Sequence, residues 1–203
     1  ENRLFRVPRY GLPTEDGVFG ALLAIPAGEK EVPGSSDDSP IILPAEVKKR
    51  DFRSLLKACC PVPGKQDYDL DVDEWMSVLK LANIWSLSTL RQRASGEAEK
   101  TLQGQGPMEK IVPGKKYHVS RWLMEGYEAL GRREQSITKE ERETLGMETY
   151  CGLVELRDRS WEWANREEGE KAHDAGFRSG FDFKAAVLEI FKEELSSDKE
   201  FSA

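Results

Sequence analysis

The sequence predicts an α+β fold, in which a small sheet is covered by helices and followed by an all-α helical extension. Two short apolar segments, Leu4–Val7 and Pro40–Pro44, have the composition of strands, and Val18–Leu23 between them has the pattern of a short helix pair. From residue 45 to the end, apolar residues recur mainly at helical intervals. This order of strand, helices, strand and further helices defines the predicted class.

Two helices are predicted in the first part of the chain, over residues 45–59 and 71–92. Pro44 suits the beginning of the first helix. The apolar face of this helix consists of Phe52, Leu55, Leu56 and Cys59. Asp71 and Glu74 form a capping box at the start of the second helix. Its apolar positions are Val72, Trp75, Leu79, Ala82 and Leu90. We expect this second helix to be central to the core.

The predicted extension contains helices over residues 108–131 and 138–165. The apolar stripe of the first consists of Val119, Trp122, Leu123, Gly126, Tyr127 and Leu130. The second begins at Thr138, whose side chain caps the helix while that of Glu141 reaches back. Its apolar face consists of Met147, Tyr150, Cys151, Val154 and Trp161. We expect these helices to pack together as hairpins.

Glycine, proline and polar runs divide the chain into four predicted parts. These are a mixed domain over 1–105, the helical extension over 106–165, a polar linker over 166–180, and an amphipathic helix with its tail over 181–203. The face of the last helix consists of Phe183, Val187, Leu188, Phe191 and Leu195. Docking of this face onto the helical part is favoured over insertion into the groove of a partner.

Composition excludes several classes of partner. The chain has 203 residues, a net charge of −7 and a pI near 5.1, which disfavour nucleic acid because its binding relies on clustered Lys and Arg. The apolar stretches are too short for a membrane helix, and none resembles a secretory signal. Three cysteines without CxxC spacing suggest neither a disulfide framework nor a zinc site. We therefore expect an intracellular protein of the cytoplasm or nucleus.

The sequence predicts no catalytic residue, no cofactor and no metal site. The chain has only two histidines, His118 and His173, and lacks the usual nucleophile, phosphate-binding, dinucleotide-binding and zinc motifs. The vicinal pair Cys59 and Cys60 lies at a predicted helix C-terminus, where the dipole disfavours a thiolate. An enzyme that uses this pair or carboxylates is the alternative of a different class, and a strongly depressed cysteine pKa would favour it.

Five segments together resemble a BTB/POZ domain, in the divergent form found in mushroom-forming fungi. They are Leu4–Leu12, Val18–Phe19, Pro40–Pro44, Phe52–Leu56 and Trp75–Ala82. The resemblance covers about residues 1 to 105 and continues in the fungal form to about Asp158. It implies that the strand over 41–43 pairs with the strand over 4–7, and that a further strand lies before Glu1.

The resemblance also implies a role in protein–protein interaction. Such domains self-associate, serve as scaffolds, or bridge substrates to a cullin-type ubiquitin ligase. Cullin binders often carry a hydrophobic–any–Glu triplet in the loop before the strand at Ile41, and the segment Ile25–Glu29 does not match it. A transcription-associated scaffold is a further refinement, although the sequence shows no DNA-reading element. The identity of the partner and the oligomeric state are left open.

We place the predicted protein-binding face on four apolar residues of the first domain. They are Phe19, Leu22, Leu23 and Ile25. With the adjacent acidic loop, this face is expected to contact another protein or a second copy of the chain.

Overall fold

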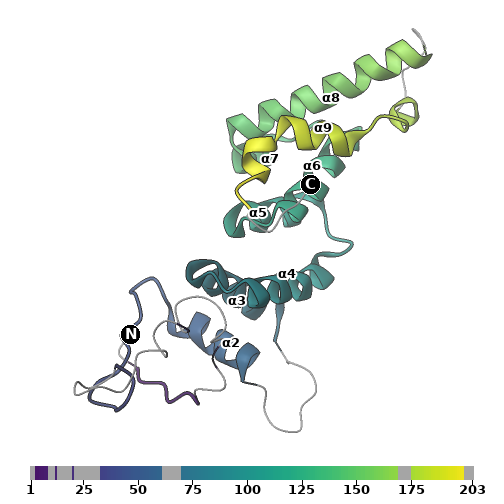
Figure 1. Cartoon of the computed structure of the whole chain (residues 1–203). Coiled ribbons are helices and arrows are strands. Elements are labelled where there is room, and N and C mark those ends of the chain that lie inside the picture. The colour runs from purple at the N-terminus through teal and green to yellow at the C-terminus, as the bar shows by residue number, and fades with distance from the viewer. Residues whose placement is uncertain are drawn as a thin grey trace. The chain divides into compact units, whose positions relative to one another are not determined.

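Helices are the only regular elements in the part of the chain that the structure describes. The computed structural model describes residues 3–8, 12, 20, 33–60, 70–168 and 175–198, and these contain no strand (Figure 1). The predicted α+β class, with its small sheet, is therefore wrong for these residues. The chain divides into two compact units, unit 1 (Glu1–Gln103) and unit 2 (Gly104–Ala203).

The two segments predicted as strands do not pair with each other. Residues 3–8 and 40–44 carry no main-chain hydrogen bonds of a ladder among the described residues. The first segment makes side-chain contacts instead: the ring centroids of Phe5 and Phe52 lie 5.1 Å apart in an edge-on arrangement, and Arg6 pairs with Asp37. Proline at positions 8, 40 and 44 removes N–H donors that a ladder would need.

Unit 1 contains α2 (Lys49–Cys59), α3 (Val72–Trp85) and α4 (Ser88–Leu102). The predicted capping box of α3 is confirmed, since Asp71 accepts from the N–H of Glu74 at 2.7 Å and the Glu74 side chain returns to the N–H of Asp71. The central place of α3 is also confirmed, because it packs against both α2 and α4. Its buried residues are Trp75, Ser77, Val78, Leu79, Leu81, Ala82 and Trp85.

The predicted helix over 71–92 is two helices in the structure. Ser86 adopts a left-handed conformation with φ of 54°, and the N–H of Leu87 reaches back to the carbonyl of Ala82 at 2.9 Å. This is the hydrogen bond of a Schellman motif, which ends a helix. The continuous apolar pattern concealed the break because Leu87 and Leu90 are themselves buried at the start of α4.

Unit 2 contains seven helical elements among its described residues. They are α5 (Pro107–Tyr117), α6 (Ser120–Arg132), α7 (Lys139–Leu145), α8 (Met147–Glu168), the 3₁₀ turn η3 (Ala175–Arg178), α9 (Phe183–Ile190) and α10 (Lys192–Leu195). The predicted helix over 108–131 is broken at His118, whose φ is 53°. The capping box of Thr138 and Glu141 is confirmed, and the predicted stripe of α6 is buried as expected.

Close approach between helices requires glycine at two positions of unit 2. A Cβ on Gly126 of α6 would lie 2.4 Å from Cγ1 of Ile111 in α5, and a Cβ on Gly152 of α8 would lie 2.7 Å from the ring of Phe191. Both contacts are shorter than packed carbon atoms allow, and both neighbours belong to the buried core. Alanine at either position would push these elements apart.

The apolar face of the C-terminal segment docks in cis, as the sequence analysis favours. Phe183, Val187, Phe191 and Leu195 are buried in the core of unit 2, and the ring of Phe191 stacks on Tyr127 with centroids 4.3 Å apart. In Figure 1 α9 lies between α8 and α6. Residues 166–168 of the predicted linker belong to α8, and its residues 175–178 form η3.

The guanidinium of Arg178 is buried within unit 2, with only 2% of the residue exposed. It donates to the carbonyls of Gly131 and Arg132 at 3.0 Å each and to the hydroxyl of Ser160 at 3.1 Å. It also lies 4.5 Å from the ring centroid of Trp161. These bonds satisfy carbonyls at the end of α6 that the helix leaves without partners, and they join η3 to α6 and α8.

Replacing Arg178 with methionine should destabilise unit 2 by about 2 kcal/mol or more, because the carbonyls of Gly131 and Arg132 would lose the donor that Arg178 supplies. Chemical denaturation followed by circular dichroism measures the loss. Arg166→Met is the matched control, since Arg166 is exposed and its ion pair with Glu162, at 3.7 Å, is also exposed, so it should cost no more than about 0.5 kcal/mol. Equal losses in the two variants would refute the assignment.

Candidate functional site

The four residues of the predicted protein-binding face lie outside the described residues. Phe19, Leu22, Leu23 and Ile25 all belong to the range 13–32, of which only residue 20 is described. Their role in binding stays a prediction. The described residues instead offer two other surfaces with unusual side chains, one on each unit.

In unit 1, the Pro40–Pro44 segment exposes one large apolar side chain. Ile42 is 89% exposed, whereas its neighbours Ile41 and Leu43 are half-buried. Ile41 packs against Gly34, in a turn where the N–H of Gly34 donates to the carbonyl of Ser39 at 2.6 Å. A single exposed isoleucine is common on protein surfaces, so Ile42 alone is weak evidence for a binding site.

In unit 2, the outward side of α8 carries an apolar stripe. Met147 is 69% exposed, Cys151 is exposed, and Tyr150 and Val154 are half-buried. The four residues follow the spacing i, i+3, i+4 and i+7, which places them on one side of the helix. We call these four residues the outer stripe. A contiguous exposed apolar stripe on a helix is a common feature of protein-binding surfaces.

The spacing of these residues and Trp161 predicts one apolar face of a packed helix. They do share a face, but it is not the face that meets the core. The buried residues of α8 are Thr149, Leu153, Leu156, Ser160 and Ala164. Leu153 and Leu156 belong to the core cluster. Spacing alone cannot decide which of two apolar faces turns inward, because that depends on the helices packed against it.

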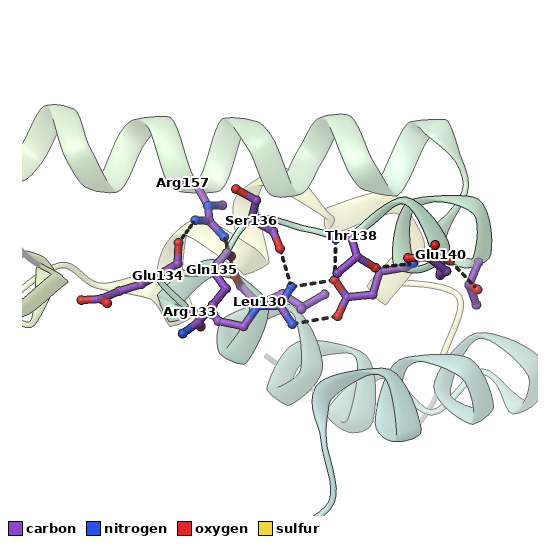
Figure 2. A network of polar contacts seen from close by, with 10 residues as sticks. Leu130, Arg133, Glu134, Gln135, Ser136, Thr138, Glu140 and Arg157 are labelled. Carbon is purple, nitrogen blue, oxygen red and sulfur yellow. Dashed lines mark hydrogen bonds and ion pairs between the residues drawn. The ribbon is translucent and has the colours of Figure 1, made fainter.

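Polar contacts fix the rotation of α8 about its axis. The Arg157 side chain donates to the carbonyls of Gln135 at 2.9 Å and Glu134 at 3.0 Å, as Figure 2 shows. On the same helix, Ser160 accepts from the buried Arg178. These three bonds hold the inner side of α8 against the loop that follows α6 and against Arg178, which in turn bonds the end of α6.

The loop between α6 and α7 is held from its other side by Arg133. Its two terminal nitrogens donate to both oxygens of Glu141, at 2.7 and 2.6 Å, and one of them also donates to the carbonyl of Ser136 at 3.1 Å (Figure 2). The hydrogen bond from Arg133 lowers the pKa of the Glu141 carboxyl and raises that of Arg133. The guanidinium groups of Arg133 and Arg157 are hydrogen-bonded to main-chain carbonyls and to the carboxylate of Glu141. Both arginines therefore stabilise the loop between α6 and α7.

A second polar group joins the C-terminal helix to the rest of unit 2. Lys115 bonds both the hydroxyl of Thr149 at 2.6 Å and the carboxylate of Glu194 at 2.8 Å, and Tyr127 donates to Glu194 at 2.8 Å. Burial, followed by the charge of Glu194, raises the pKa of the Tyr127 hydroxyl. The phenol therefore stays protonated and holds α10 in place.

Cys59 and Cys60 do not have the environment of a nucleophile. Burial raises the pKa of the Cys59 thiol to about 11, and burial also raises the pKa of Cys60. A protonated thiol is a poor nucleophile, so this observation disfavours the alternative of a cysteine enzyme. Of the two histidines, His118 is exposed at the end of α5, and His173 lies outside the described residues.

Neither metal nor membrane chemistry finds support in the described part of the chain. No group of three or more His, Cys, Asp or Glu side chains is arranged there to hold a metal ion. None of the described helices combines the length and the apolar character needed to cross a membrane.

Comparisons with protein-family models, with curated proteins and with solved structures found no match to this chain. Function is therefore inferred from the geometry of the described residues.

The pKa of Cys59 tests the enzyme alternative. In a Cys60→Ala/Cys151→Ala variant, the ultraviolet absorbance of the thiolate should appear only above the ordinary thiol pKa of 9.0, because burial disfavours the charged form. In denaturant the same thiol should return to its ordinary value. Titration of Cys59 in the folded chain below neutral pH would revive a nucleophilic role.

Proposed function

We propose that this chain is a protein-interaction module, and that the outer stripe of α8 is one of its binding surfaces. The observation that carries the proposal is the exposure of Met147 and Cys151 beside the half-buried Tyr150 and Val154. Removal of such a stripe from water by a partner favours binding, by roughly 25 cal/mol for each Å² of apolar surface buried.

The firm packing of α8 against the rest of unit 2 supports the proposal. The helix is anchored by a packed inner face and by the carbonyl contacts of Arg157. Its outer stripe is therefore presented on a preorganised element, and a partner would not have to pay for folding it. Self-association, a scaffold role and binding to a cullin-type ligase stay predictions of the sequence resemblance, and an enzyme that uses Cys59, Cys60 or carboxylates stays the alternative.

Replacing Met147 with aspartate should weaken binding while leaving the fold intact. An exposed side chain costs little to replace, so we expect a change in the free energy of unfolding within about 0.5 kcal/mol. Binding is measured in two ways: by sedimentation of the chain over a concentration series, and by the set of proteins that the immobilised chain retains from a cell extract.

Val112→Asp is the matched control, because Val112 is also an exposed apolar residue of unit 2 but lies on α5. We expect at least one bound species, a second copy or another protein, to be retained by wild type and by Val112→Asp and lost by Met147→Asp. Identical masses and identical retained proteins for wild type and Met147→Asp would contradict the proposal.

A further inference from the structure

The charges around the outer stripe differ between its two edges. On one edge, Arg142 of α7 lies 5.6 Å from the ring centroid of Tyr150. Along the opposite edge and the continuation of the stripe, α8 exposes four carboxylates: Glu148, Glu155, Asp158 and Glu162. The helical spacing of these four residues keeps them on the outward side of α8.

Two of these carboxylates form ion pairs along α8, and for two no ion pair is found among the described residues. Glu155 pairs with Arg159 at 2.6 Å, and Glu162 pairs with Arg166 at 3.7 Å. Glu148 and Asp158 form no ion pair with any described residue, although the charge of Arg157 acts on Asp158 from the neighbouring position. The stripe therefore lies beside carboxylates whose charge is available to a partner.

We propose that the outer stripe binds an amphipathic helix of another protein whose apolar side is bordered by Lys or Arg. The inference rests on the proposed function and names the partner's chemistry. The spacing i, i+3, i+4 and i+7 fits the side chains of a helix lying along α8. Cations on the partner would face Glu148 and Asp158, and such complementarity selects among partners and raises the rate of encounter.

Other occupants fit this surface less well. Nucleic acid would place phosphates beside the carboxylates of α8, which is unfavourable. A second copy docked antiparallel by its own outer stripe would bring two acidic edges together, with repulsion between like charges. Helix α2 has a cationic solvent face, with Lys49 and Arg53 on it. Its apolar face, however, is buried in unit 1 and unavailable for docking.

The test uses a synthetic peptide helix with leucines at i, i+3, i+4 and i+7 and lysines at the flanking positions. Its binding to the full chain is followed by fluorescence anisotropy, with a second peptide in which glutamate replaces each lysine. We expect the lysine peptide to bind and the glutamate peptide to fail. Glu148→Lys/Asp158→Lys should weaken binding by about tenfold, and Met147→Asp should weaken it to a similar extent.

Glu109→Lys/Glu193→Lys is the matched control, because it makes the same change in net charge at exposed positions of α5 and α10. We expect it to alter binding by no more than about twofold. An equal loss in this control would mean that general charge attraction explains the binding, and tight binding to Met147→Asp would mean that the stripe is not in contact. Either result overturns the inference, as does binding of the glutamate peptide.

Failure of the inference is distinguishable from failure of the proposed function. If wild type ignores the lysine peptide while Met147→Asp still abolishes retention of a cellular protein, the surface binds a partner of different chemistry and only the inference fails. Self-association that depends on Met147 would likewise overturn the inference alone, by making a second copy the occupant. If Met147→Asp changes no binding at all, both fail.

Discussion

Arg157 and Arg178 decide which side of α8 faces solvent. Each donates hydrogen bonds to main-chain carbonyls at the end of α6 or in the loop that follows. Arg178 also donates to Ser160 on the inner side of α8. Carbonyls at the end of a helix need such partners when they are buried. Because these bonds and the packing of Leu153 and Leu156 fix the rotation of α8, the outer stripe is held facing away from the core.

The buried guanidinium of Arg178 also connects the C-terminal elements to the rest of unit 2. It lies 5.9 Å from the ring centroid of Phe183 at the start of α9 and 4.5 Å from that of Trp161 on α8. Burial lowers the pKa of Arg178, with the nearby charge of Arg157 next in effect. The carbonyl acceptors and the two aromatic rings offset this unfavourable environment, so a side chain from η3 joins three helices.

Local signals in the sequence were sufficient for some features and insufficient for others. The capping boxes at Asp71 and Thr138 could be predicted because all their atoms lie within four residues. The expected sheet was wrong for the described residues because strand pairing depends on segments far apart in sequence, and the composition of Ile41–Leu43 does not guarantee a partner.

The outer stripe was recognised as apolar, but its exposure depends on how α6 and α9 pack against α8. Arg178 was missed because it lies in a polar stretch, although the aromatic residues at 161, 181 and 183 were a signal that could have pointed to it.

The central claim is that the outer stripe of folded α8 faces solvent, and the reactivity of Cys151 tests it most directly. In a Cys59→Ala/Cys60→Ala background, the rate of labelling by a small thiol reagent is measured for the native chain and for the chain in denaturant. The structure predicts similar rates in both states, because Cys151 is already exposed when α8 is folded. Strong protection of Cys151 in the native chain would contradict this account and would place that face of α8 in the core.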